Sequence, residues 1–505
     1  MTADQSRLQR EKEEEEQELI DVTRRQFLKV AGVGGLAAAL GPALLTACAK
    51  GGTSSSSSAA NIGVSGEGSI KVGVTAPYSG IASFAGVIVN NSLNAAVQQL
   101  NSQGGIGGRK IELLLRDTGV DPQNGPKAYT ELSNTPGVVG ILWCGAGLEQ
   151  ALPQIKRDGF PVVSVFGDLE SANELYPSGA ASGRSVFQMI IPGNYAVDTL
   201  ADYAKNDRGY SSAALLADTV TDPNGLVPKA FRAAMAKQGI AIKGIETFTI
   251  NDSDYGPQLQ RIKAGRPETL WIWGLTANTA AIVKALAALD ASYVDTPTAK
   301  GPGWHPHIIG SPGATGDKSW IQLAGDAAKV GTVTAWHVGG LIGLPQFAIA
   351  GWMKKYLNKQ PTGGEESPAD GLATLLEGIK KAGSTDRAKI VEGIETMGPI
   401  KFASIPFSFS STRHLNKTRD DMILVTMERG GTGPAPTDPP YQLGKEWKEQ
   451  SLANTAAGPT HLVRPTLEAN KRAHPDVMDV VLKQGYGTQC TKHADGTLGK
   501  ECKIH

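Results

Sequence analysis

The segment 70–105, IKVGVTAPYSGIASFAGVIVNNSLNAAVQQLNSQGG, constrains the fold of this chain more than any other stretch. Apolar residues alternate with Lys71 and Gly73 and then give way to Pro77 and Ser79, which predicts a strand that ends in a loop. Apolar residues at helical spacing follow and end at two glycines, which predicts a helix with one buried face. In open parallel sheets, ligands bind beyond the carboxyl ends of the strands. The segment therefore predicts the first strand, ligand-facing loop and helix of an α/β fold.

The same alternation of strand and helix continues along the chain. Strands are expected at 110–116, 138–144, 161–166, 213–216, 245–250 and 269–273, and helices at 125–134, 148–158, 195–205, 226–237, 257–264 and 277–289, with 185–191 as a bridging segment. Strands joined by crossover helices predict parallel sheets covered on both faces. Because 505 residues are too many for one core, we expect two principal domains with appendages.

A weak internal repeat accompanies this alternation. The segments 98–125 and 233–258 each read as a helix, a glycine stop, a basic turn and a strand. Either a duplication or the general repetition of α/β units explains this echo, and both predict two similar lobes.

The first 47 residues read as a targeting signal. Arg24 and Arg25, followed by Phe27 and Leu28, resemble the twin-arginine export motif, and a weakly apolar run comes next. That run ends in Leu-Thr-Ala-Cys at Cys48, which resembles a lipoprotein cleavage site where the thiol is lipidated. The alternative is a single transmembrane anchor, for which the apolar run is short. We expect export and a lipid anchor, so that the protein lies outside the cytoplasm on a membrane face.

Residues 48–68 are small and polar, which predicts a flexible tether between the anchor and the folded body. The chain carries 49 basic and 49 acidic residues. A chain without a basic excess does not favour nucleic acid as a partner.

The order of segments from 69 to 430 resembles the type I periplasmic substrate-binding proteins of the branched-chain amino acid (Leu/Ile/Val) ABC transporter family. The segments that carry the resemblance are IKVGVTAPYSG, NSQGGIGGRKIELLLRDTGVDPQNG, VVGILWCGAG, FPVVSVFG and SVFQMIIPGNYAVDTLADYAK. The resemblance implies a two-lobed α/β fold with a three-strand hinge. It also implies a small-molecule ligand held between the lobes and permease transmembrane subunits as partners.

Mapped onto this chain, the resemblance implies a division into domains. Lobe 1 is expected at 69–192 and 336–399, lobe 2 at 193–335 and 400–430, and a C-terminal extension at 431–505. Three crossings between lobes favour hinge closure around a ligand.

The ligand-binding residues follow from the same resemblance. In lobe 1 they are expected in the loops after the first, third and fourth strands, and in lobe 2 in the loops that face lobe 1. The expected residues are Tyr78, Ser79, Phe84, Gly145, Ala146, Gly147, Gly167, Asp168, Asp222, Asn224, Thr276 and Ser311.

Several of these residues depart from the pattern of the family. Glycines replace the serine-rich loop that binds the ligand carboxylate. Either the backbone amides of residues 145–147 hold an anion, or Gly145 and Gly147 simply form a turn. Asp168 would attract an ammonium or a hydroxyl group, or else it caps the following segment. Leu275 and Ser311 occupy places where an aromatic and an acidic residue are common. The ligand is therefore expected to be an amino acid, an amide, or a small carboxylate or aromatic compound.

The C-terminal extension ends in two Cys-x2-His pairs, Cys490 with His493 and Cys502 with His505. Four such ligands can bind zinc, but the spacing is not that of a zinc finger, and a disulfide between Cys490 and Cys502 is natural in an exported protein. We therefore expect the disulfide and no metal site, and Cys144 as a buried free thiol.

The sequence supports no catalytic template. It contains no G-x-S-x-G elbow, no H-E-x-x-H helix and no Walker loop, and no cofactor is expected. The favoured function is a solute-binding lipoprotein that supplies an ABC importer. The alternatives are a ligand-sensing module of the same fold, and an exported metal-dependent enzyme.

Overall fold

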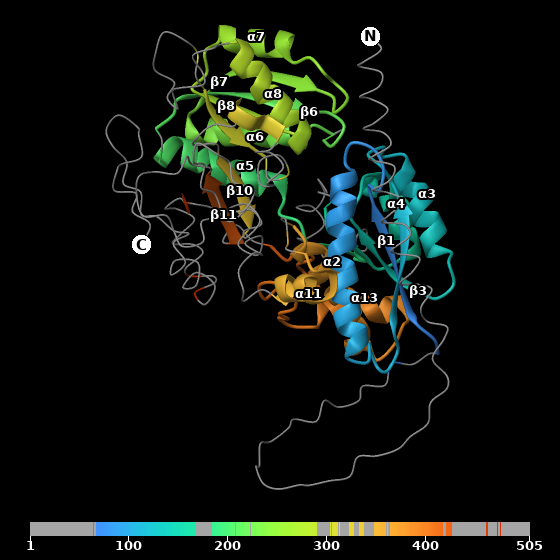
Figure 1. The fold of residues 1–505 in the computed structure, drawn as a ribbon. Helices are drawn as coiled ribbons and strands as arrows, with labels where there is room; N and C mark the ends of the chain where they lie inside the picture. Colours follow the sequence, from blue (N-terminus) through green and yellow to red (C-terminus); the bar gives the residue numbers. More distant parts are fainter. Residues whose placement is uncertain are drawn as a thin grey trace, which may run out of the picture. The chain divides into compact units, whose positions relative to one another are not determined.

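Two β-sheets with helices on their faces account for most of the described chain (Figure 1). The computed structural model describes residues 64, 67–166, 184–207, 209–222, 224–289, 304, 306–311, 313, 323–327, 333–337, 348–359, 361, 364–417, 421–426, 461–462, 472 and 475. These residues exclude the signal, Cys48 and most of the tether, Gly167, Asp168, and the four Cys and His residues of the C-terminal extension. The predictions made for these residues therefore concern positions outside the described part of the chain.

The first sheet is parallel throughout its described strands. Its order is β2 (Ile111–Asp117), β1 (Ile70–Ala76), β3 (Val138–Trp143), β4 (Val162–Ser164) and β5 (Val186–Gln188). The expected strand at 70–76 thus lies next to the centre of the sheet, where both of its faces are covered. All carboxyl ends of a parallel sheet lie at one edge, so the loops after β1, β2 and β3 meet there.

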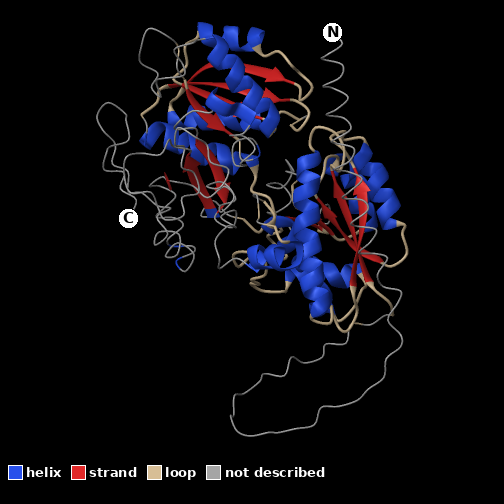
Figure 2. Ribbon diagram, viewed as in Figure 1, coloured by secondary structure: helices blue, strands red, loops and turns tan. Residues whose placement is uncertain are grey.

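Helices cover both faces of this first sheet (Figure 2). One face packs against α2 (Ser83–Ser102), α11 (Ala348–Leu357), α12 (Glu366–Ala382) and α13 (Arg387–Glu395). The other face packs against α3 (Asn124–Ser133) and α4 (Leu148–Asp158). The alternation in β1 explains this sandwich, because Ile70, Val72 and Val74 point to one face while Gly73 lies against Leu132 of α3 on the other.

The second sheet is parallel in its centre and antiparallel at one side. Its order is β12 (His461–Leu462), β11 (Met422–Thr426), β10 (Val333–His337), β9 (His307–Gly310), β8 (Thr269–Trp273), β6 (Ser212–Asp218) and β7 (Ala241–Phe248). The strands β11 and β12 run antiparallel to their neighbours. Two residues of the C-terminal extension therefore form the last strand of this sheet.

Helices also cover both faces of the second sheet. The helices α5 (Gly193–Asp202) and α6 (Leu226–Gln238) pack on one face, and a π-helical turn, η3 (Tyr203–Asp207), continues α5. The other face carries α7 (Gly256–Ala264), α8 (Thr276–Leu289) and the short 3-10 helix η5 (Gly325–Ala327). The prediction of an α/β fold with parallel sheets covered on both faces is confirmed.

Two segments lie elsewhere than the sequence predicted. Residues 185–191 contain a strand of the first sheet, β5, rather than a simple bridge. Residues after 400 were expected with the second sheet, but Ala403, Ile405, Phe407 and Phe409 are buried in the core of the first sheet. Their apolar side chains fill the space beside α12, which explains why this segment stays with the first sheet.

The order of the described elements requires the chain to pass between the two cores three times. It leaves the first core after β5, returns after β10, and leaves again before β11. Among the described elements, no helix has both the length and the apolar character needed to cross a bilayer.

Candidate functional site

The carboxyl ends of β1, β2 and β3 form one connected set of loops. Asp117, the last residue of β2, accepts hydrogen bonds through Oδ1 from the backbone amides of Tyr78 (2.9 Å) and Gly119 (2.8 Å). The amide of Thr118 donates to Ala76 O (3.1 Å), the last residue of β1. Asp117 therefore fixes the loop after β1 against the loop after β2.

The loop after β3 packs directly on the loop after β2. A Cβ placed on Gly145 would lie only 2.1 Å from Oγ1 of Thr118, and one placed on Gly147 would lie 2.3 Å from the carbonyl oxygen of Pro122. Gly147 also has a left-handed backbone (φ 83°) and is the N-cap residue that precedes α4. The glycines that replace the serine-rich loop are thus explained by close packing, since no side chain fits at either position.

Backbone amides of this loop remain available for a ligand. Among the described residues, the amides of Gly145, Ala146 and Gly147 have no acceptor. The first amides of α4 follow directly, and they have no partner within the helix because of their position at its start. Together these amides direct the positive ends of their dipoles toward the carboxyl edge of the sheet, where they favour an anion.

Three hydroxyl groups near this edge are enclosed without a hydrogen-bond partner among the described residues. They belong to Thr75, Tyr78 and Thr118. Thr75 and Thr118 are fully buried, whereas the ring of Tyr78 is half-buried and packs against the first core. An enclosed hydroxyl without a partner is unfavourable, so each is a position where a ligand atom or a water molecule would be stabilising.

Tyr78 lies over the first turns of α2 and near the thiol of Cys144. A Cβ on Gly86 of α2 would lie 2.9 Å from its ring. Burial, and then the neighbouring Cys144 and Asp117, raise the pKa of the Tyr78 hydroxyl well above its ordinary value, so it stays a donor at neutral pH. Burial likewise raises the pKa of Cys144, which is a buried free thiol, as the sequence predicted.

The other lobe 1 residues of the prediction lie on the same side of β1. Ser79 is exposed, and its Oγ lies 4.0 Å from a Cβ built on Gly119. Phe84 is half-buried in the first turn of α2. The structure therefore brings Tyr78, Ser79 and the 145–147 loop together at one edge.

The residues predicted from the second sheet are already bonded elsewhere. Asp222 accepts the backbone amides of Leu226 (2.8 Å) and Val227 (2.9 Å) and so caps α6. Thr276 donates to the carbonyl of Gly313 (2.9 Å), and Ser311 donates to the carbonyl of Gly274 (3.1 Å). These side chains hold their own loops together, and their ligand-binding roles stay predictions.

Asn224 has a different partner. Its side-chain amide donates to the carboxylate of Glu149, in the first turn of α4. Glu149 was not predicted from the sequence, and neither were Thr75, Asp117 or Thr118. The run Arg-Asp-Thr-Gly at 116–119, polar residues at the end of a strand, is the signal that could have identified the last two.

In the described part of the chain, no group of three or more His, Cys, Asp or Glu side chains is placed to hold a metal ion.

The chain matches a family model described as periplasmic binding protein over residues 69–432, and a twin-arginine translocation signal over residues 21–41. It is 24% identical over 358 residues to the Leu/Ile/Val-binding protein homolog 3 of Brucella melitensis, a match that spans 70% of this chain and 90% of that protein.

Solved structures share the fold at low identity. A branched-chain amino acid transporter substrate-binding protein from Streptococcus pneumoniae, in complex with isoleucine, superposes with a TM-score of 0.58 and 17% identity over 71% of this chain and 96% of its own. An ABC transporter solute-binding protein from Rhodopseudomonas palustris, in complex with 3,4-dihydroxybenzoic acid, gives a TM-score of 0.59 and 18% identity over 72% and 94%.

Proposed function

The chain belongs to the periplasmic binding protein family, and from this premise we propose that it captures a small organic carboxylate between two lobes and delivers it to the permease of an ABC importer. It is a solute-binding protein of the ABC transporter type, exported by a twin-arginine signal. Members of the family and the similar proteins are substrate-binding proteins, so the enzyme alternative is set aside.

The observation that carries the ligand class is the loop 145–147. Its backbone amides have no acceptor among the described residues, and they lie at the start of α4 beside the unpartnered hydroxyl of Thr118. Amides at a helix start bind anions without any charged side chain. A carboxylate placed there would accept the hydrogen bonds that the missing serines otherwise supply.

The similar proteins are compatible with a carboxylate. The two solved relatives hold isoleucine and 3,4-dihydroxybenzoic acid, and the carboxylate is the group that these two molecules share. Thr276 and Ser311, the side chains predicted from the second sheet, are bonded to backbone carbonyls, which leaves the ammonium of an amino acid without an evident partner there. We therefore propose that the amino group is dispensable.

Three matched compounds test this ligand class. Leucine, 4-methylpentanoate and leucinamide share one side chain and differ in the charged groups. We expect 4-methylpentanoate to bind within about tenfold of leucine, and leucinamide to bind far more weakly, in a thermal-shift titration. If leucinamide binds as tightly as leucine, the proposed carboxylate site is wrong.

Asp168, which follows the fourth strand, is the residue to test if the amino group proves to matter. If leucine binds far better than 4-methylpentanoate, an acidic residue is holding the ammonium. The variant Asp168→Ala would then lose roughly 1 kcal/mol or more of binding free energy for leucine alone.

The two lobes of the proposal are built on the two sheets, and the three crossings between them form the hinge. Ligand favours closure only to the extent that it binds the closed form better.

We also propose that Cys48 is lipidated and that 48–68 tethers the body to a membrane face. Cys48→Ser should then release the exported protein from the membrane fraction, and retention of this variant in that fraction would contradict the anchor.

A further inference from the structure

Two of the three crossings between the cores lie side by side. One is the end of β5 at Gln188, and the other is the segment 414–417 that leads to β11. The amide of Gln188 donates to His414 O (2.7 Å), and the amide of Asn416 donates to Gln188 O (3.1 Å). These bonds pair Gln188 with Leu415 in a short parallel ribbon. Any hinge motion has to bend or break this ribbon.

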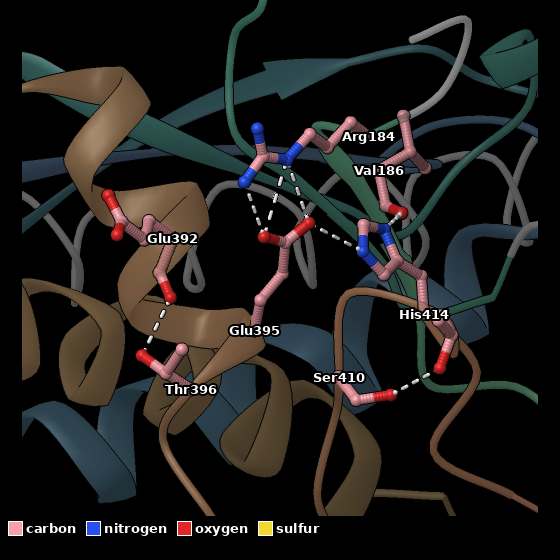
Figure 3. Close-up of polar contacts among 8 residues, drawn as sticks. Arg184, Val186, Glu392, Glu395, Thr396, Ser410 and His414 are labelled. Carbon is pink, nitrogen blue, oxygen red and sulfur yellow. Dashed lines mark hydrogen bonds and ion pairs between the residues drawn. The ribbon is translucent and has the colours of Figure 1, made fainter. Parts of the chain in front are cut away.

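The side chain of His414 fixes the ribbon to the first core (Figure 3). Its ring stacks on that of Phe187 in β5, with 4.2 Å between the ring centroids and 22° between the ring planes. Its Nδ1 lies 3.0 Å from Val186 O, and its Nε2 lies 3.1 Å from Oε1 of Glu395, the last residue of α13. The side chains of His414 and Glu395 are only 6% and 3% exposed.

Glu395 is held in turn by Arg184. The guanidinium donates from Nη2 to Oε2 (2.7 Å) and from Nε to Oε1 (3.0 Å). Burial opposes the negative charge of Glu395, but the bonds to Arg184 and His414 outweigh it and lower the pKa of the carboxyl. Glu395 is therefore a carboxylate, which accepts hydrogen bonds and donates none.

Both partners of the imidazole are hydrogen-bond acceptors, but a neutral ring carries only one hydrogen. Val186 O is an acceptor, so Nδ1 must carry a hydrogen. A neutral ring with its hydrogen on Nδ1 then has a lone pair on Nε2, and this lone pair faces the carboxylate of Glu395. Only the doubly protonated ring donates to both partners. One proton therefore decides whether the contact between His414 and Glu395 is a charge-assisted hydrogen bond or a repulsion.

We propose that His414 and Glu395 are positioning residues for the hinge, and that protonation of His414 stabilises the crossing ribbon in the arrangement seen in this structure. The inference goes beyond ligand capture. It rests on the proposed function only in taking the crossings as the hinge.

The surroundings of His414 define the pH range of this effect. Burial lowers the pKa of His414 below its ordinary value of 6.5, and the bonds to Val186 and Glu395 offset part of that effect. An opening of the ribbon that breaks these two bonds while the ring stays buried against Phe187 lowers the pKa further, so protonation favours the closed ribbon, whereas an opening that exposes the ring to water would reverse the sign. Among the described residues, the charged groups that face the ring are Glu395 from α13 and Arg184 from the segment before β5. Arg413, the chain neighbour of His414, is bonded to Ser408 instead. Acidification from pH 8 to pH 5 should therefore tighten the ribbon.

The test is amide hydrogen exchange of the ligand-free full chain between pH 5 and pH 8. Protection factors, which correct for the intrinsic pH dependence of exchange, are measured for the amides of Gln188 and Asn416. In the wild-type protein we expect protection to rise roughly two- to tenfold on acidification, the effect of about one hydrogen bond. A flat wild-type profile, or protection that falls on acidification, would overturn the proposal.

Variants separate the switch from a merely structural role. Glu395→Gln replaces the carboxylate with an amide that can donate to the neutral ring, so protection should be high and independent of pH. His414→Gln should also give a flat profile. His307→Gln, which changes a buried histidine of the second sheet that bonds Tyr210, should keep the wild-type profile. A pH-dependent profile in folded Glu395→Gln would contradict the proposal.

Because this experiment uses no ligand, its failure leaves the proposed function untouched. A flat profile together with tight ligand binding would reject the switch alone.

Discussion

At the residue scale, close packing of the loop after β3 explains why position 145 holds a glycine rather than the serine of the family pattern. The space that a side chain would need is occupied by Oγ1 of Thr118 and by the backbone of Ala76. We expect Gly145→Ala to lower the free energy of unfolding by about 1–3 kcal/mol, measured by urea denaturation, because the added methyl overpacks this contact. Gly351→Ala is the matched control, because nothing lies within 4 Å of its Cβ position in α11, and it should stabilise by about 0.5–1 kcal/mol.

A second substitution tests the cause of this loss. Thr118→Ala removes Oγ1 and should restore most of the stability of Gly145→Ala. If the double variant is as unstable as the single one, the contact with Thr118 does not explain the glycine.

Asp370 is a second residue whose environment predicts a measurable effect. It is 1% exposed in α12 and accepts hydrogen bonds from the amide of Ala403 (2.7 Å) and from Oγ of Ser404 (2.7 Å). Burial raises its pKa from 3.8 to about 7, although these two bonds and the nearby Lys417 oppose the rise. The carboxyl therefore ties the buried segment 403–409 to α12 while resisting ionisation.

The sign of the pH dependence follows from this raised pKa. Between about pH 4 and pH 7 the folded state binds the proton of Asp370 and the unfolded state releases it, so ionisation costs stability as the pH rises. Asp370→Asn has no proton to lose. Its stability relative to the wild type should increase from pH 4 to pH 8 by up to about 4 kcal/mol, measured by urea denaturation at each pH. Parallel stability curves for the two proteins would contradict this assignment.

At the scale of elements, helix α6 explains a residue that the sequence assigned to the ligand. Asp222 bonds the first amides of α6, as a capping residue does. We expect Asp222→Ala to lower the free energy of unfolding by about 1 kcal/mol and to leave the affinity for the bound carboxylate within twofold. Asp386→Ala, which removes the cap of α13, is the control and should cost about the same. A tenfold loss of affinity in Asp222→Ala with unchanged stability would instead support the predicted ligand role.

The elements that sequence reasoning found are the long, periodic ones. The strand at 70–76 and helices such as α2 and α6 carry enough apolar periodicity to be recognised without the structure. The three-residue strand β5 has no measurable period. In the segment 400–409, alternation at Ile405, Phe407 and Phe409 was present, but pattern alone does not say which of two cores such a strand-like segment joins.

At the scale of the whole molecule, the fold was predictable because the β-α units repeat one pattern, an apolar strand followed by a loop and an amphipathic helix. The candidate site was only partly predictable. The sequence placed Tyr78 and the loop 145–147 at one edge because loops after parallel strands meet there, and their contact with a ligand stays a prediction. Whether Asp222, Thr276 and Ser311 have free side chains depends on bonds within their own loops, which no spacing in the sequence reveals.

The central claim is that this protein holds one small carboxylate and does not convert it. The most direct measurement is isothermal titration of the exported chain with carboxylates that include branched-chain amino acids and hydroxybenzoates, followed by mass spectrometry of the released compound. We expect a stoichiometry of one and recovery of the compound unchanged, and at a hundredfold excess over its Kd the ligand should raise the free energy of unfolding by about 2.7 kcal/mol. Conversion of the bound compound to a product would contradict the account.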